Sequence, residues 1–239
     1  MYQAKNAGRN TFRFFDPEMQ AFLVARSSLE ACLKLAIVSN QLILHYQPQF
    51  NNHRDIKFNN HRDIIGAEVL IRWQHPQLGF LPPSEFIPLA EETGLIAPIG
   101  FWVLETVCAQ LVSWQVHPTL KNIKIALNVC PKQFRQLDFV AQVQRLIAKY
   151  AIKPQQLKFE LTENILVENL DATIDSMSAL KKQGISFSLD DFGTGYSSLQ
   201  YLKRLPINQL KIDKSFVRDI AVDSNDQAIK HHVVIFHWQ

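Results

Sequence analysis

The sequence has few cysteines, no long apolar run and little net charge, and each absence excludes a class of protein. Its three cysteines, Cys32, Cys108 and Cys130, are odd in number and widely spaced. This spacing argues against a disulfide framework or a structural zinc site and fits a reducing cytoplasm. The net charge of +3 is too small to indicate a nucleic-acid polymer or a membrane as partner. The longest apolar stretch, residues 95–104, is too short to span a bilayer, and the polar N-terminus does not resemble a signal peptide. We therefore expect a cytoplasmic protein without a membrane segment.

Segments with alternating apolar and polar residues are separated by segments with helical periodicity. The length of 239 residues and the hydrophobic fraction of 47% suffice for one large domain with a core. Strands are expected over 42–49, 64–73, 124–130, 157–164, 186–191 and 209–213, and helices over 17–40, 84–92, 96–115, 138–150, 169–183 and 197–204. Residues 75–83 are expected to form a loop. The alternation predicts an α/β fold with a parallel sheet, and the number of repeats favours a TIM-like (β/α) barrel over an open sheet.

A short duplication lies between the first two predicted strands. Residues 50–57 are repeated almost unchanged as residues 58–65, and each copy contains a His-Arg-Asp triplet. We interpret the repeat as a lengthened polar hairpin loop, where insertions cost little, rather than as a metal or catalytic site. Because the insertion has an even number of residues, the side chains of the next strand can stay on the same faces of the sheet. An insertion absorbed within that strand would instead shift Glu68.

Polar residues recur on one face of the predicted strands, whereas the opposite face is apolar. The residues on the polar face are Glu68, Arg72, Asn128, Glu160, Asp190 and Lys211. In a closed barrel this face lines the interior, and polar residues near the carboxyl ends of barrel strands are typically catalytic. The solvated face of an open sheet is the alternative interpretation.

Two adjacent carboxylates, Asp190 and Asp191, close one strand and precede a glycine-containing turn. Neighbouring carboxylates repel each other, so a fold that keeps both usually supplies a cation; a solvated turn is the alternative. Carboxylate and amide oxygens without paired cysteines or histidines favour Mg²⁺ or Mn²⁺ as the bound metal. The site could hold two such ions. Arg72 offers a planar fork for phosphate, and Lys211 adds a second positive charge. This combination predicts metal-dependent hydrolysis of a phosphodiester.

The same residues carry a resemblance to a known family. The ordered motifs are Glu68-Val69-Leu70 with Arg72, Asn128-Val129, Glu160-Leu161-Thr162-Glu163, Asp190-Asp191-Phe192-Gly193-Thr194-Gly195 and Lys211-Ile212-Asp213. Over residues 25–228 this series resembles EAL domains, which are bacterial cyclic di-GMP phosphodiesterases with a modified TIM barrel. The resemblance implies cleavage of one phosphodiester bond of cyclic di-GMP to give linear pGpG.

The resemblance also implies a role for individual residues. The implied metal ligands are Glu68, Asn128, Glu160 and Asp190 for one Mg²⁺ or Mn²⁺ ion and Asp191 for a second. The implied substrate contacts are Arg72, Gln47 and Asp213. By the same resemblance, Lys211 contacts the attacking water and Glu163 holds the loop after Asp191. The expected partners are cyclic di-GMP and a second copy of the chain, in a homodimer formed through the barrel.

Both ends of the sequence bear on its domain organisation. Residues 1–20 resemble the end of a GGDEF (diguanylate cyclase) domain, and residues 21–239 are assigned to the EAL domain, whose triplet reads Glu-Val-Leu here. A Glu-Gly-Val-Glu motif that follows in the family has no counterpart, and the histidines of residues 231–237 match no family motif. We therefore expect a barrel that is incomplete at its C-terminus. Three hypotheses remain open: a phosphodiesterase, a catalytically impaired module that binds cyclic di-GMP or a protein, and a non-functional gene fragment.

Overall fold

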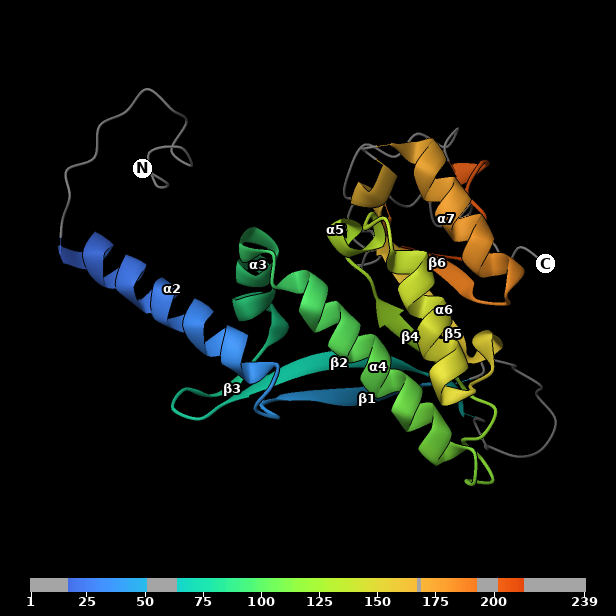
Figure 1. The fold of residues 1–239 in the computed structure, drawn as a ribbon, viewed down its shortest axis with the longest axis horizontal. Coiled ribbons are helices and arrows are strands. Elements are labelled where there is room, and N and C mark those ends of the chain that lie inside the picture. The colour runs from blue at the N-terminus through green and yellow to red at the C-terminus, as the bar shows by residue number, and fades with distance from the viewer. Residues whose placement is uncertain (1–16, 51–63, 167–168, 193–201, 213–239) are drawn as a thin grey trace, which may run out of the picture.

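The computed structural model describes residues 17–50, 64–166, 169–192 and 202–212, and it shows helices packed on one twisted sheet (Figure 1). The helices are α2 (Pro17–Ala36), α3 (Pro83–Thr93), α4 (Ile96–Trp114), α5 (Pro131–Phe134), α6 (Phe139–Tyr150), η1 (Pro154–Gln156), η2 (Glu163–Leu166) and α7 (Leu170–Lys182). The strands are β1 (Leu42–Phe50), β2 (Ile64–His75), β3 (Gly79–Leu81), β4 (Lys124–Asn128), β5 (Leu157–Thr162), β6 (Ser186–Phe192) and β7 (Gln209–Ile212). All six predicted strands are present within a few residues of their expected limits. The predicted helix over 197–204 lies largely outside the described residues.

The sheet has the order β1-β2-β4-β5-β6-β7, and β3 pairs with β2. β1 is antiparallel to β2, whereas the four pairs from β2 to β7 are all parallel. Parallel neighbours need crossover connections, which α3 and α4 provide from β2 to β4, α6 from β4 to β5, and α7 from β5 to β6. Within the described residues, β1 and β7 form the two edges of the sheet. The carboxyl ends of β2, β4, β5, β6 and β7 therefore lie at one end of the sheet.

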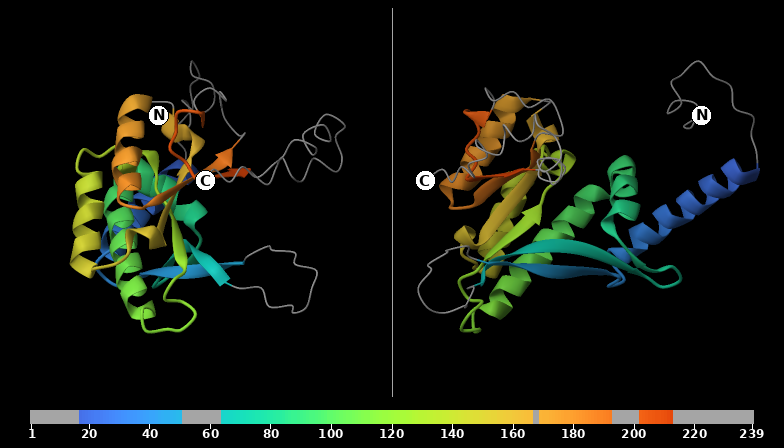
Figure 2. Two further views of the ribbon diagram at one scale, coloured as in Figure 1. Left: turned by 90° about the vertical axis from the view of Figure 1, so that its right-hand side faces the viewer. Right: turned by 180° about the vertical axis from the view of Figure 1, so that it is seen from behind.

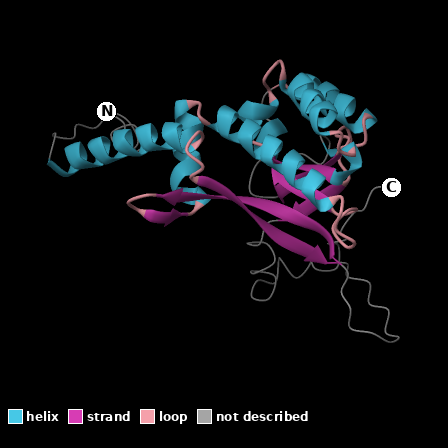
Figure 3. Cartoon of the chain, turned by 60° about the horizontal axis from the view of Figure 1, so that its bottom comes forward, coloured by secondary structure: helices cyan, strands magenta, loops and turns pink. Residues whose placement is uncertain are grey.

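One face of the sheet is apolar and is covered by the helices (Figure 3). An aromatic cluster binds this face to α5 and α6: Phe159 and Phe187 of the sheet and Phe134 and Phe139 of the helices are at most 2% exposed. Ring centroids lie 5.8 Å apart between Phe159 and Phe187 and 5.9 Å apart between Phe139 and Phe159. The apolar side chains therefore lie under the helices, as the alternation predicts, and the polar residues fall on the opposite face.

Some local predictions were wrong. Residues 163 and 164 were assigned to a strand, but β5 ends at Thr162 and η2 begins at Glu163. Residues 75–83 were expected to form a loop, but Gly79–Leu81 form β3, because Gly79 adopts a φ of +75° that closes a tight turn and places Leu81 opposite Trp73. Residues 129 and 130 were assigned to a strand, but β4 ends at Asn128. Pro131 then begins the single turn of α5, where a proline fits without losing an intrahelical hydrogen bond.

The duplicated sequence does not disturb the pairing of β1 with β2. Residues are paired in regular register from Leu42 opposite Trp73 to Gln49 opposite Gly66, with an irregularity only at Phe50. Residues 51–63 of the duplication lie outside the described residues. The register keeps Glu68 opposite Gln47, so the insertion is not absorbed in the part of β2 that carries Glu68.

Two helices have unusual surroundings. By length and composition alone, α4 could cross a membrane, but seven of its side chains are buried, among them Ile99, Val107 and Leu111. α2 projects from the rest of the described chain (Figure 2), and Leu33 and Ala36 in its last turn are its buried residues. The apolar character of α4 is thus accounted for by packing in the core.

Candidate functional site

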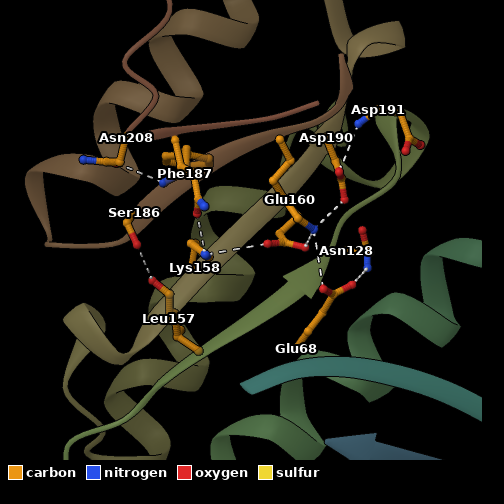
Figure 4. A network of polar contacts seen from close by, with 12 residues as sticks. Glu68, Asn128, Leu157, Lys158, Glu160, Ser186, Phe187, Asp190, Asp191 and Asn208 are labelled. Atoms are coloured by element: carbon orange, nitrogen blue, oxygen red, sulfur yellow. Dashed lines mark hydrogen bonds and ion pairs between the residues drawn. The ribbon is translucent and has the colours of Figure 1, made fainter. Parts of the chain in front are cut away.

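The ammonium group of Lys211 lies at the centre of a polar cluster on the inner face of the sheet, which is the face opposite the helices. Its Nζ donates hydrogen bonds of 2.7 Å to Glu160 Oε2 and 2.7 Å to Asp190 Oδ2, and it lies 3.5 Å from Glu68 Oε2. Asn128 Nδ2 is 3.5 Å from the other oxygen of Glu68. Figure 4 shows the side chains of Glu68, Glu160 and Asp190 pointing toward one another. Residues from five parallel strands therefore converge, as the alternation of side chains predicts.

The cluster combines burial with an excess of negative charge. Glu160 has a fully buried side chain, while Lys211, Glu68 and Asp190 are 25%, 21% and 20% exposed. Burial raises the pKa of Glu160 above its ordinary value, and the hydrogen bond from Lys211 opposes this shift. Burial also lowers the pKa of Lys211, but its hydrogen bonds to Asp190 and Glu160 outweigh burial and hold that pKa above the ordinary value. The ammonium group therefore stays charged and screens the carboxylates from one another.

The other predicted residues of the motifs lie close to this cluster. Asp191 follows Asp190 with a φ of +53°, and its N–H donates a hydrogen bond of 3.0 Å to Asp190 Oδ1. This left-handed conformation is uncommon for an aspartate and turns the exposed Asp191 away from the strand direction. Glu163 is 6% exposed and begins η2, directly after β5. Both residues therefore lie where the strands end, at the entrance to the site.

Two of the predicted substrate contacts, Arg72 and Gln47, are not part of the cluster around Lys211. Arg72 lies four residues after Glu68 on β2, is half-buried, and donates a hydrogen bond of 2.8 Å to the carbonyl of Ile71. Gln47 is exposed on β1, directly opposite Glu68. Asp213 lies outside the described residues.

The structure adds two residues that the motif analysis missed. Lys158 Nζ lies 3.7 Å from Glu160 Oε1 and donates a hydrogen bond of 2.8 Å to Gln209 Oε1. Burial lowers the pKa of Lys158, and the charge of Glu160 opposes this shift. The alternation along β5 already placed Lys158 on the face of Glu160, so the signal was present in the sequence. The contact with Gln209 was not, because it joins residues 51 positions apart.

The side chains of the cluster have the chemistry to bind a divalent cation, but Lys211 sets the distances between their oxygens. Oxygens of three carboxylates already converge on one positive charge, and Glu160 Oε1 is buried without a hydrogen-bond partner. Such hard oxygen donors suit Mg²⁺ or Mn²⁺. Among the described residues, however, no three acidic, histidine or cysteine side chains are close enough together to coordinate one ion as they stand. Direct coordination by these carboxylates therefore requires the ammonium group of Lys211 to move aside.

The fold and the site define an α/β domain of the (β/α)-barrel class with an acidic centre at the carboxyl ends of its parallel strands. The family model of the EAL domain matches residues 30–235. The chain is 40% identical over 234 residues to the bifunctional diguanylate cyclase/cyclic di-GMP phosphodiesterase MucR of Pseudomonas aeruginosa, covering 98% of this chain and 33% of MucR. It is 34% identical over 234 residues to the cyclic di-GMP phosphodiesterase PdeR of Escherichia coli, covering 98% of this chain and 34% of PdeR.

A solved structure of the PaMucR phosphodiesterase in complex with c-di-GMP superposes with a TM-score of 0.76 at 40% identity, covering 86% of this chain and 80% of that one. The chain belongs to the EAL domain family. Its expected fold class, α/β with a TIM-like barrel of the EAL type, is therefore confirmed. The chain spans about a third of the length of the curated relatives named here.

Proposed function

We propose that this chain is a cyclic di-GMP phosphodiesterase that hydrolyses cyclic di-GMP to linear pGpG with Mg²⁺ or Mn²⁺. The observation that carries the proposal is the convergence of Glu68, Glu160 and Asp190 on one positive charge at the carboxyl ends of the strands. Membership of a family whose relatives are named for this activity supports it. We assign the metal to Glu68, Asn128, Glu160 and Asp190, and a second ion to Asp191.

When bound, a divalent ion lowers the pKa of a coordinated water and offsets charge on a phosphodiester oxygen. The side chains of this chain supply the remaining functions. Lys211, whose ammonium group stays charged, can donate a hydrogen bond to the attacking water. Arg72 would contact a phosphate oxygen, with Gln47 and Asp213 as further substrate contacts, and its guanidinium suits phosphate because it donates in a planar fork. Glu163, buried at the start of η2, would hold the loop that follows Asp191.

The second candidate function is a module that binds cyclic di-GMP without cleaving it. It is favoured by one observation: Lys211 already neutralises part of the carboxylate cluster and occupies the point on which the oxygens converge. A site satisfied in this way needs no metal to remain folded. The two functions differ in whether bound cyclic di-GMP is converted to pGpG.

The test is to incubate the purified 239-residue chain with cyclic di-GMP and to separate products by chromatography. A phosphodiesterase forms pGpG with Mg²⁺ or Mn²⁺ and none after EDTA treatment. Calorimetry with cyclic di-GMP in Ca²⁺ measures binding separately. Binding without turnover in any of the three metals would support the second function and reject the first.

The remaining aspects of the proposal concern the setting of the domain. We propose a GGDEF remnant over residues 1–20, which lie largely outside the described residues; the name of MucR, which combines the two activities, supports the pairing of the two domains. A homodimer through the barrel and a cytoplasmic location stay predictions. Light scattering on the purified chain tests the dimer, and fractionation of the source cells tests the location.

A further inference from the structure

Lys158 is a buried cation whose contacts with its neighbours have no counterpart in the motifs. It lies on the inner face of β5, two residues before Glu160, and its side chain is 13% exposed. A buried ammonium group is costly unless it is paired, and this one is shared between Gln209 Oε1 at 2.8 Å and Glu160 Oε1 at 3.7 Å. We propose that Lys158 is a positioning residue for Glu160: anchored by Gln209, it attracts the inner oxygen of the carboxylate and leaves the outer oxygen to the centre of the site. The proposal rests on the proposed metal-dependent function.

The two oxygens of Glu160 have different surroundings. Oε2 accepts a hydrogen bond from Lys211, on the side of Asp190 and Glu68. Oε1 is buried and has no hydrogen-bond partner, so the charge of Lys158 at 3.7 Å stabilises it without a hydrogen bond. The carboxylate thus lies between two ammonium groups, which disfavour its rotation. Such outer partners keep a metal-binding side chain oriented before the ion arrives.

Lys158 reaches Gln209 by crossing β6, the strand between them. Pairing places Ser186 beside Lys158, and it places Ser188 beside both Glu160 and Gln209. On this face β6 therefore has two small side chains in succession, and these leave space for the lysine stem. Ser188 is fully buried, and its Oγ has no hydrogen-bond partner. The crossing joins β5 to β7 and so connects Glu160 with the strand that carries Lys211.

The experiment measures the dissociation constant of Mn²⁺ by electron paramagnetic resonance on the full chain. The variants are Lys158→Met, Gln209→Leu and the double variant, with Lys182→Met as control, because Lys182 is an exposed lysine at the end of helix α7. We expect Lys158→Met to weaken Mn²⁺ binding by about 10–100-fold, the usual effect of removing an outer partner of a metal ligand. Gln209→Leu should weaken binding in the same direction. The double variant should be no weaker than Lys158→Met alone, since both changes remove one interaction. Lys158→Arg should retain more affinity than Lys158→Met, and Lys182→Met should bind as the wild type does.

Circular dichroism establishes that each variant is folded. If Lys158→Met does not fold, Gln209→Leu carries the test, because it keeps the lysine and removes only its anchor. The proposal is overturned if folded Lys158→Met, or Gln209→Leu in its place, binds Mn²⁺ as tightly as the wild type or more tightly. Lys158 would then only fill space or repel the ion. If the wild type binds Mn²⁺ but does not hydrolyse cyclic di-GMP, the proposed function is rejected. The role of Lys158 is then still decided by the Mn²⁺ dissociation constants of the variants.

Discussion

At the scale of single residues, Lys211 decides the state of the site. Its ammonium group contacts three carboxylates, one of which is fully buried. Together with Lys158 it balances two of their three negative charges, so one formal negative charge remains. Asp191, at the entrance, adds to that excess. A site with unbalanced negative charge has affinity for a cation whether or not its present spacing suits coordination.

Replacing Lys211 by methionine tests this balance. The change keeps the apolar stem and removes the charge, so the buried Glu160 loses its hydrogen-bonded partner. We expect the free energy of unfolding in EDTA to fall by about 3 kcal/mol, the low end for a broken buried pair because the other groups are partly exposed. Mn²⁺ should restore more stability to the variant than it adds to the wild type, since the ion replaces the missing charge.

Urea unfolding with and without Mn²⁺ measures both effects. Lys34→Met is the control: it removes a surface pair with Glu30 whose side chains are 57% and 33% exposed, and such a pair contributes about 0–1 kcal/mol. A Lys211→Met variant as stable as the wild type in EDTA would contradict the charge-balance argument.

The carboxylates themselves should be required for turnover. Glu68→Ala and Asp190→Ala each remove an oxygen donor from the convergence point, so we expect metal-dependent hydrolysis of cyclic di-GMP to fall by about 100-fold or more. Glu85→Ala and Asp175→Ala remove exposed carboxylates from α3 and α7 and should leave the rate unchanged. Undiminished turnover in either site variant, or in EDTA, would rule out the metal-binding role.

At the scale of secondary-structure elements, the position of Glu68 depends on the pairing of β1 with β2. That register is regular up to Gln49 and Gly66, and the duplicated segment joins the strands beyond this point. The joining segment precedes β2, and Glu68 lies four residues into that strand, within its regularly paired part. The length of the segment is therefore separate from the geometry of the site.

Deleting residues 50–57 should accordingly change little. The second copy restores the same sequence ahead of Ile64, and shortening a loop alters its closure entropy by only about 0.6 kcal/mol per twofold change in length. We expect the unfolding midpoint to stay within about 4 °C of the wild type and the Mn²⁺ dissociation constant to be unchanged. Thermal denaturation and Mn²⁺ titration of the deletion variant measure the two quantities. Lost Mn²⁺ affinity in a folded deletion variant would mean that the insertion positions Glu68.

At the scale of the whole molecule, the site joins elements that are distant in the sequence. Glu68 and Lys211 are 143 positions apart and come from β2 and β7, so the convergence exists only when the sheet between them is formed. An ion bound there interacts with the folded chain and with few groups of the unfolded one. Binding and global stability are therefore linked.

The linkage predicts a rise in unfolding temperature with Mn²⁺. At an ion concentration about 100 times the dissociation constant, the folded state gains about 2.7 kcal/mol. For a chain of this size that corresponds to a rise of roughly 5–10 °C. Differential scanning calorimetry measures the rise, and the double variant Glu68→Ala, Asp190→Ala should lose most of it. An equal rise in that variant would place the ion elsewhere on the protein.

The sequence by itself determined which residues face the interior. Side chains alternate along a strand, so the parity of Glu68, Asn128, Glu160 and Asp190 within their segments places them on one face. The ordered motifs also indicated the family, which the comparisons confirm. The short elements β3 and α5 were missed because they depend on the turn at Gly79 and on Pro131 rather than on a periodic pattern.

Only the tertiary structure decided how these side chains meet. Parity gives a direction but no distance, so it did not show that Lys211 occupies the point between the carboxylates. The link from Lys158 to Gln209 depends on small side chains on the strand that separates them, and a linear sequence does not show which strands are neighbours. Long-range contacts of this kind are set by the pairing of β5, β6 and β7, because the register of pairing fixes which residue of one strand lies beside which residue of the next.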